Sequence, residues 1–248
     1  MPVHYERTGA AAVLTIDRPD RRNAVDGPTA ESLREGFRRF VEDDSARVLV
    51  VTGAGGHAFC AGADLKAMSN PVMAPEGPMG FTRLVSPKPT IAAVEGWCVA
   101  GGLEIACWCD FRVVAEGARF GCLERRWGVP LIDGGTQRLP RIIGTGRALD
   151  LILTARQVDA QEALSMGLAN YVVPKGQALT AALELAGKIA AYPWACVIAD
   201  RRALYEGLDR PLETGLEIEA MLGRGVITDA QQGAMRFAGG EGRHGRGA

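Results

Sequence analysis

Two glutamates stand in surroundings where a carboxylate could do acid–base chemistry. Glu104 lies in the otherwise apolar segment 103–108, and Glu124 follows the segment 120–123. A carboxylate on an apolar face is costly unless it is paired, solvated or protonated. From the residues alone two interpretations stay open: a structural ion pair, or a carboxyl with a perturbed pKa that exchanges protons with a substrate.

Two glycines precede Glu104 at the point where a strand is expected to pass into a helix. The apolar run 90–94 predicts a buried strand, and the segment from Leu103 predicts the start of a buried helix. The first N–H groups of a helix have no partner within it, and glycine lets a ligand come close to the backbone. Gly101 and Gly102 are therefore candidate positions for main-chain donors to a ligand.

A third carboxylate, Asp133, stands in the glycine-rich turn 127–136. Its position favours one of two roles. It is either the cap of the helix that follows or an additional acid or base.

The elements that must position these residues alternate between strands and helices. Strands are predicted by apolar runs at 11–16, 47–53, 90–94, 111–115, 118–120 and 169–173. Helical spacing is found at 29–42, 147–154, 159–166, 177–191, 193–206, 212–222 and 229–238. This order predicts a layered α/β core over residues 1–190, a helical region over 191–238 and a disordered tail over 239–248.

The stretch 53–58 fits the dinucleotide fingerprint G-x-G-x-x-A, which raises the alternative of an NAD-dependent dehydrogenase. That fingerprint needs a long helix beginning within it, followed by a strand and an acidic residue. Here another glycine and the three prolines of segment 70–80 follow instead, so a dinucleotide site is not expected. Segment 70–80 is predicted to be a loop, either a mobile pocket wall or a plain connection.

Charge and cysteine content narrow the class of protein. The net charge of −1 over 248 residues provides no global attraction for nucleic acid or an anionic membrane. The longest apolar runs, broken by Glu95 and Glu104, are shorter than the roughly 20 residues of a membrane span, and no signal-peptide pattern opens the chain. The six cysteines form no CxxC pair and no zinc pattern. We therefore expect reduced thiols, a cytoplasmic location and no metal site.

Four ordered motifs between about Val13 and Pro211 resemble those of the crotonase (enoyl-CoA hydratase/isomerase) superfamily. They are Ala58-Phe59-Cys60-Ala61-Gly62-Ala63-Asp64-Leu65, then Ile91 to Glu104 with Ala100-Gly101-Gly102, then Gly134-Gly135-Thr136-Gln137-Arg138-Leu139-Pro140, and Ala163 to Ala169 followed by Val172-Val173. The resemblance implies a spiral of ββα units with a C-terminal helical region, assembled as a homo-trimer or a hexamer.

The resemblance also implies roles for particular residues. The N–H groups of Ala63 and Gly101 would form the oxyanion hole for an acyl-CoA thioester. Glu104 would activate the water that attacks Cβ, and Glu124 would exchange a proton at Cα. Further substrate or CoA contacts are expected from Arg22, Ala61, Asp64, Leu65, Lys66, Gly102, Trp127 and Asp133.

The implied activity is hydration of a 2-enoyl-CoA, with coenzyme A as part of the substrate and no separate cofactor. Two sequence features depart from the common hydratase pattern: Arg125-Arg126-Trp127 follows Glu124, and Pro130-Leu131-Ile132-Asp133 replaces a proline-glycine turn. An enoyl-CoA isomerase, another crotonase-type acyl-CoA reaction and a non-catalytic acyl-CoA-binding protein therefore stay as alternatives, because one fold supports several chemistries.

Overall fold

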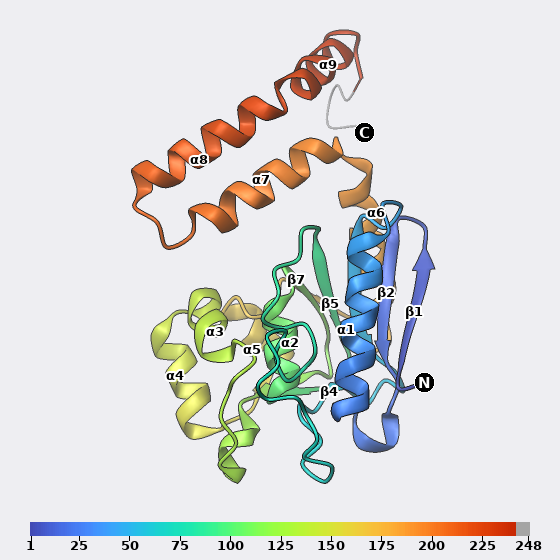
Figure 1. Cartoon of the computed structure of the whole chain (residues 1–248), viewed down its shortest axis with the longest axis vertical. Helices are drawn as coiled ribbons and strands as arrows, with labels where there is room; N and C mark the ends of the chain where they lie inside the picture. The colour runs from blue at the N-terminus through green and yellow to red at the C-terminus, as the bar shows by residue number, and fades with distance from the viewer. Residues whose placement is uncertain (242–248) are drawn as a thin grey trace.

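The computed structural model describes residues 1–241, and a six-stranded sheet lies at its centre (Figure 1). The strands follow the order β1-β2-β3-β5-β7-β10. Their bounds are β1 (Val3–Thr8), β2 (Ala11–Ile16), β3 (Val48–Gly53), β5 (Thr90–Val94), β7 (Phe111–Ala115) and β10 (Tyr171–Val173). β1 pairs antiparallel with β2, whereas every other pair in this sheet is parallel.

Both faces of this sheet are covered, which explains why its inner strands are continuous apolar runs. Alternate residues of β3 enter different clusters: Leu49 and Val51 pack with Phe37 of α1 (Gly27–Glu42), whereas Val48 and Val50 pack with α6 (Ala178–Ala191). Figure 1 shows α1 on the near side of β1 and β2. The α6 contact uses small residues four apart, Ala178, Ala182 and Ala186, which let the helix lie close to the sheet.

A second sheet carries the residues of interest on its strand ends. It has the order β4 (Ala58–Cys60), β6 (Trp97–Val99), β8 (Arg119–Gly121) and β9 (Val158–Asp159). β4, β6 and β8 run parallel, so their carboxyl ends meet at one edge. Ala63, Gly101 and Glu124 each follow one of these ends within three residues. The sheet therefore gathers segments that are far apart in the sequence.

Six short helices of the described chain lie between the strands of the two sheets or follow them in the chain. They are η1 (Pro19–Arg21), α2 (Gly101–Trp108), η2 (Leu123–Trp127), α3 (Gly135–Ile143), α4 (Thr145–Thr154) and α5 (Ala160–Ser165). α2 is buried along its whole length, which fits its apolar sequence, and it brings Glu104 into the interior.

Three helices complete the described chain: α7 (Trp194–Gly207), α8 (Leu212–Gly225) and α9 (Ile227–Ala238). Arg201 on α7 is anchored to Asp110 by hydrogen bonds of 2.9 and 3.0 Å to its two carboxylate oxygens, and the Tyr205 hydroxyl donates to the same carboxylate. α8 and α9 bury no residue, and Figure 1 shows them at the end of the molecule away from β4. Within residues 1–241 no single helix is both long enough and apolar enough to cross a membrane. Taken together, α6 and α7 meet these two criteria, but the pair is bent by 106° at the break between them.

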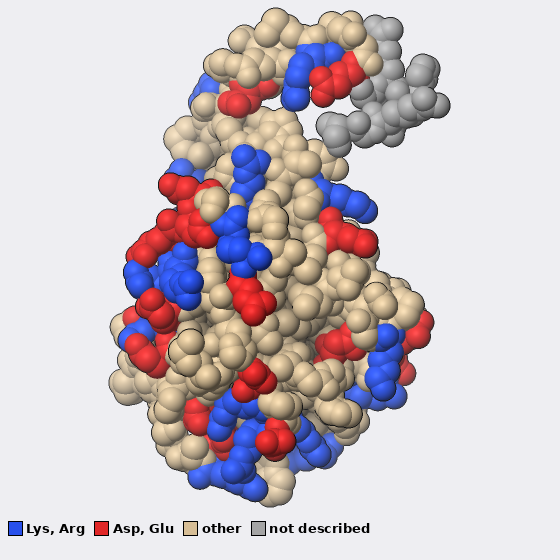
Figure 2. Space-filling view, turned by 90° about the vertical axis from the view of Figure 1, so that its right-hand side faces the viewer, with Lys and Arg blue, Asp and Glu red and all other residues tan. Residues whose placement is uncertain are grey.

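The predicted α/β fold with a C-terminal helical region is confirmed. The division at residue 190 stays a prediction. Most of the predicted tail, residues 242–248, lies outside the described residues. Basic and acidic side chains are interspersed on the face shown in Figure 2, in keeping with the small net charge.

Candidate active site

The turns after β4 and β6 bring two main-chain N–H groups to one place. A Cβ on Gly62 would lie 2.7 Å from the nitrogen of Gly101 and 2.8 Å from Cβ of Ala100, so only glycine permits this approach. Gly62 also has a φ of +87°, and Ala100 a φ of +54°, a strained conformation for a residue with a side chain. Within residues 1–241 the N–H groups of Ala63 and Gly101 donate no hydrogen bond. This is the arrangement that a two-donor oxyanion hole requires.

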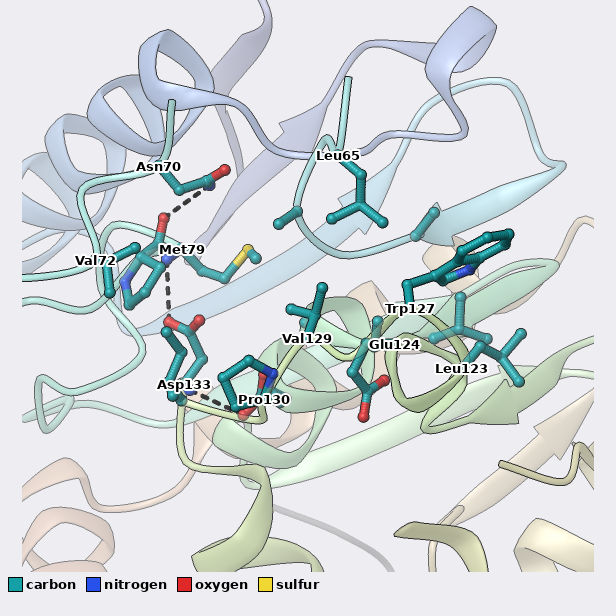
Figure 3. Close-up of a pocket in the computed structure, with 18 of the residues that line it drawn as sticks. Leu65, Asn70, Val72, Met79, Leu123, Glu124, Trp127, Val129, Pro130 and Asp133 are labelled. Carbon is teal, nitrogen blue, oxygen red and sulfur yellow. Dashed lines mark hydrogen bonds between the residues drawn. The ribbon is translucent and has the colours of Figure 1, made fainter. Parts of the chain in front are cut away.

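Ala63 and Gly101 line a cavity of about 280 Å³, shown in Figure 3. Most of its wall is apolar and comes from segment 61–79, from η2 and from the turn before α3. The larger apolar side chains are Leu65, Met68, Val72, Pro78, Met79, Val99, Leu123, Trp127, Val129, Pro130 and Ile132. Its polar side chains are Asn70, Glu104, Glu124 and Asp133. Small-molecule sites are usually lined in this way, by mostly apolar side chains and a few polar groups.

Glu104 stands on α2 and is held by the start of α3. Its Oε1 accepts hydrogen bonds from the main-chain N–H groups of Asp133 (2.9 Å) and Gly135 (2.8 Å). A Cβ on Gly135 would lie 2.9 Å from this oxygen, so glycine makes the contact possible. Burial, assisted by the charges of Asp133 and Glu124, raises the pKa of Glu104 to about 7, although the two amide hydrogen bonds oppose the shift. Glu104 can therefore both accept and give a proton near neutral pH.

Glu124 lies on η2 in a different environment. It is buried, and neither of its carboxyl oxygens has a hydrogen-bond partner within the part of the chain that the structure describes. Burial raises its pKa. An orphaned carboxyl of this kind is expected to be neutral until water or a substrate supplies a partner.

Asp133 does not cap α3, and the cap interpretation is wrong. The N-cap residue is Gly134, with a φ of 101° and no side-chain capping bond. The Oδ1 of Asp133 instead accepts from the N–H of Met79 (3.0 Å) and from the hydroxyl of Thr82. Burial raises the pKa of this carboxyl as well. The carboxylate that accepts from the first N–H group of α3 is that of Glu104, from another helix, and not that of Asp133.

The structure brings together eight of the twelve residues singled out in the sequence. Ala61, Ala63, Leu65, Gly101, Glu104, Glu124, Trp127 and Asp133 all line the cavity. Segment 70–80, for which a pocket wall was one of two interpretations, contributes Asn70, Val72, Pro78 and Met79.

The other four predicted residues do not line this cavity. Asp64 pairs with Arg18 at 3.0 Å, and Gly102 packs so tightly on the carbonyl of Cys60 that a Cβ would collide with it. Arg22 and Lys66 are exposed, and the carbonyl of Arg22 accepts from the N–H of Ala61 (3.1 Å). A role in CoA binding stays a prediction for Arg22 and Lys66.

Several pocket residues were not anticipated individually: Asn70, Met79, Leu123, Val129 and Ile132. Leu123 directly precedes Glu124 and Val129 follows five residues after it, so their closeness in sequence to a predicted site residue could have indicated that they line the cavity. No signal pointed to Met79, because its contact with Asp133 spans 54 positions.

Comparison with known proteins decides the family. A model of the family described as enoyl-CoA hydratase/isomerase matches residues 6–242. The chain belongs to this enoyl-CoA hydratase/isomerase family.

Members of the enoyl-CoA hydratase/isomerase family are similar over nearly the whole chain. Enoyl-CoA hydratase EchA19 of Mycobacterium tuberculosis is 39% identical over 94% of this chain and 92% of its own. Short-chain-enoyl-CoA hydratase of Clostridium acetobutylicum is 37% identical over the same two shares. The crystal structure of enoyl-CoA hydratase EchA1 from Mycobacterium marinum superposes with a TM-score of 0.90 at 36% identity, covering 96% of this chain and 95% of that one.

No group of three or more His, Cys, Asp or Glu side chains in residues 1–241 is arranged to hold a metal ion. The expectation that this family member uses no metal or separate cofactor stays a prediction.

Proposed function

We propose that the chain is an enoyl-CoA hydratase, a lyase that adds water across the double bond of a 2-enoyl-CoA. One observation carries this proposal: two buried carboxyls, Glu104 and Glu124, line the same cavity as Ala63 and Gly101, whose N–H groups donate no hydrogen bond within residues 1–241. The names of its relatives in both comparisons support the same activity.

In the proposed mechanism the thioester oxygen accepts from the N–H groups of Ala63 and Gly101. These donors stabilise the negative charge that reaches this oxygen when a nucleophile adds at Cβ. Loss of one comparable donor costs on the order of 10²- to 10³-fold in rate in other enzymes, which sets the scale of the contribution.

The two glutamates divide the proton transfers. The water oxygen forms a bond to Cβ, and Glu104, as the carboxylate, accepts a proton from that water. Glu124 starts as the neutral acid and gives its proton to Cα of the enolate, which completes the addition of one water. The next water, bound between them, returns a proton from Glu104 to Glu124. The raised pKa of each residue suits these roles near neutral pH.

The character of the cavity supports an uncharged, apolar acyl group. Among the residues that the structure describes, no Lys, Arg or His lines the cavity, whereas three carboxyls do. An acyl chain that ends in a carboxylate would meet like charges without a counter-ion, which is unfavourable in a buried site. The apolar side chains of Leu123, Val129 and Ile132 suit a hydrocarbon substituent instead.

Absorbance of the enone thioester provides the test. Purified protein is mixed with short-, medium- and aromatic-chain 2-enoyl-CoAs and with one dicarboxylic 2-enoyl-CoA, and loss of the absorbance is followed. We expect turnover of the uncharged substrates and a 3-hydroxyacyl-CoA product by mass spectrometry. Double-bond migration of a 3-enoyl-CoA without hydration would favour an isomerase, and tight binding of the esters without any reaction would favour a non-catalytic binding protein.

The chain is also proposed to assemble as a homo-trimer or hexamer. The support is the apolar surface of α8 and α9, where Leu212, Leu216, Met221, Ile227 and Phe237 are all more than half exposed. Sedimentation velocity on the full chain tests this: Leu216→Glu should convert the assembly to a smaller species, and a monomeric wild-type chain would contradict the proposal. A cytoplasmic location is proposed on the cysteine pattern alone, and cell fractionation tests it.

A further inference from the structure

The peptide group between Pro78 and Met79 is held from both sides in the wall of the cavity. Asn70 Nδ2 donates to the Pro78 carbonyl at 3.1 Å, and the Met79 N–H donates to Asp133 Oδ1 at 3.0 Å (Figure 3). We call these two contacts the peptide clamp. Each clamping side chain has a second fixed partner: Asn70 Nδ2 also donates to the Val25 carbonyl at 3.0 Å, and Thr82 donates to Asp133. The clamp is therefore tied to the core on both sides.

The side chain that the clamp carries touches the proposed oxyanion hole. Met79 is buried and lines the cavity, and its methyl group fills the space beside Gly101, where a Cβ would collide with it. A methionine side chain has three rotatable bonds and readily changes shape. Without a fixed backbone at Met79, this contact would not keep a defined position.

Asp133 joins the clamp to the proposed acid–base residue. Its side chain binds the N–H of Met79, while its own N–H donates to Oε1 of Glu104 at 2.9 Å. One residue therefore contacts both the segment that packs on Gly101 and the carboxylate that activates water.

We propose that Asp133 and Asn70 are positioning residues, which clamp the Pro78–Met79 peptide so that the Met79 side chain keeps the Gly101 N–H aligned with the thioester oxygen. This inference rests on the proposed function, because it assigns the clamp to the same oxyanion hole. It gives Asp133 a structural partner in place of the separate acid–base role that the sequence left open.

The same loop has another tether that offers a matched control. Ser69 Oγ accepts from the N–H of Gly27 at 3.0 Å, but Ser69 does not line the cavity. Ser69→Ala loosens the loop next to Asn70 without touching the clamped peptide.

The first experiment compares kcat and KM for a 2-enoyl-CoA in the wild type and in Asp133→Ala, Asp133→Asn, Asn70→Ala and Ser69→Ala. Because misplacement by about 1 Å costs on the order of 10²-fold, we expect Asp133→Ala and Asn70→Ala to lower kcat by about 10- to 100-fold with KM changed by less than about 3-fold. Asp133→Asn keeps an oxygen for Met79 and Thr82 and should restore most of the rate. Ser69→Ala should match the wild type.

Two results would overturn the proposal. If Asp133→Asn is as slow as Asp133→Ala, the carboxylate itself is needed and Asp133 acts as an acid or base. If Ser69→Ala is as slow as Asn70→Ala, any loosening of the loop suffices and the clamp has no special part. Thermal unfolding of each variant shows whether a slow protein is still folded.

A double-mutant cycle tests whether the clamp acts through Met79. In a Met79→Ala background there is no long side chain left to position, so Asp133→Ala should lower kcat by much less than it does in the wild type. Equal factors in the two backgrounds would contradict the assignment.

Binding of acetoacetyl-CoA, measured by calorimetry, separates this inference from the proposed hydratase activity. The enolate of this probe carries an oxyanion beside the thioester and needs no turnover. We expect Asp133→Ala to weaken its binding at least 10-fold and Asp133→Asn to leave it within about 3-fold, since a lost set of hydrogen bonds is restored by the amide. If the wild type binds the probe in this pattern yet hydrates nothing, the hydratase proposal fails and the clamp stands. Equal binding by all variants refutes the clamp.

Discussion

Glu104 and Glu124 line one cavity, but within residues 1–241 only the Glu104 carboxyl accepts hydrogen bonds. Two main-chain N–H groups fix Oε1 of Glu104, whereas both oxygens of Glu124 are buried without a partner in the described residues. This asymmetry favours different starting states for the two carboxyls. The amides favour a charged Glu104, and burial among apolar groups favours a neutral Glu124.

Replacing either glutamate by glutamine should abolish most of the hydration rate. Glutamine keeps the shape but cannot transfer the proton, and general acid–base catalysis of this kind contributes about 10²- to 10⁴-fold. We expect kcat to fall by at least about 10²-fold in Glu104→Gln and in Glu124→Gln, with small changes in the binding of a product CoA ester. Enone absorbance and calorimetry supply the two measurements.

Glu116→Gln is the matched control for this pair, since Glu116 is exposed in the turn after β7. It should have the wild-type rate. Full activity in Glu124→Gln would rule out its role as the acid.

The pH dependence of kcat/KM should report Glu104. In the proposed mechanism the carboxylate of Glu104 activates water, and burial raises its pKa to about 7, so kcat/KM should increase as the pH rises through about 7. Stopped-flow hydration at pH 5 to 9 measures this limb. An increase complete by pH 5 would show that Glu104 titrates as an ordinary exposed carboxyl.

Stability should depend on pH in the opposite sense. A carboxyl whose pKa is higher in the folded chain than in the unfolded chain retains its proton longer when folded, so the free energy of unfolding decreases as the pH rises from about 4.5 to about 7. Glu104→Gln removes this loss and still accepts the two amide hydrogen bonds. At 1.36 kcal/mol per pH unit, the free energy of unfolding of the variant should exceed that of the wild type above pH 7 by at most about 3 kcal/mol.

Urea unfolding of both proteins between pH 4 and pH 8 provides the measurement. The two curves should converge at the acid end, where Glu104 is protonated in both the folded and the unfolded chain. A constant difference at every pH would mean that the substitution acts through packing and not through charge.

Gly62→Ala should damage the proposed oxyanion hole specifically. The added Cβ would lie 2.7 Å from the nitrogen of Gly101 at a φ of +87°, so this donor must move. We expect kcat to fall by on the order of 10²-fold, the cost of one lost oxyanion donor. Steady-state kinetics and thermal unfolding check it together.

Gly56→Ala separates backbone strain from the collision. Gly56 also has a positive φ, +69°, but nothing lies within 4 Å of its added Cβ. This variant should lose stability, about 1–2 kcal/mol, and keep its rate. If both variants lose activity equally, strain alone explains the effect.

The elements that were predicted well are those whose buried residues form an uninterrupted apolar run in the sequence. The strand at 90–94 was predicted at the bounds that β5 has, because all five of its residues are buried and the four after Thr90 are apolar. β1 was not predicted, since most of Val3–Thr8 is polar and partly exposed and its pairing with β2 is all that defines it.

The candidate site shows the same limit. Gly101, Glu104 and Glu124 carry local signals, a glycine at a helix start and carboxylates in apolar runs, whereas Ala63 was predicted only through the family resemblance. The partner of Asp133 was not, because nothing in the turn 127–136 indicates that its side chain turns toward Met79 and Thr82. The position of Asp133 before a helix predicted a cap, but its side chain instead accepts a hydrogen bond from Met79, 54 positions away in the sequence.

Five of the six cysteines are buried, so the reactivity of these thiols reports whether the chain is folded or unfolded. Burial raises the pKa of Cys60 and Cys122 to about 12 and that of Cys107 to about 11, so almost no thiolate forms at these positions in the native protein. Cys196, on α7, is partly accessible and stands apart from them. An alkylating reagent should therefore modify one cysteine in the folded chain and six in the unfolded chain. The mass spectrum of the labelled protein then gives the fraction of molecules that have unfolded.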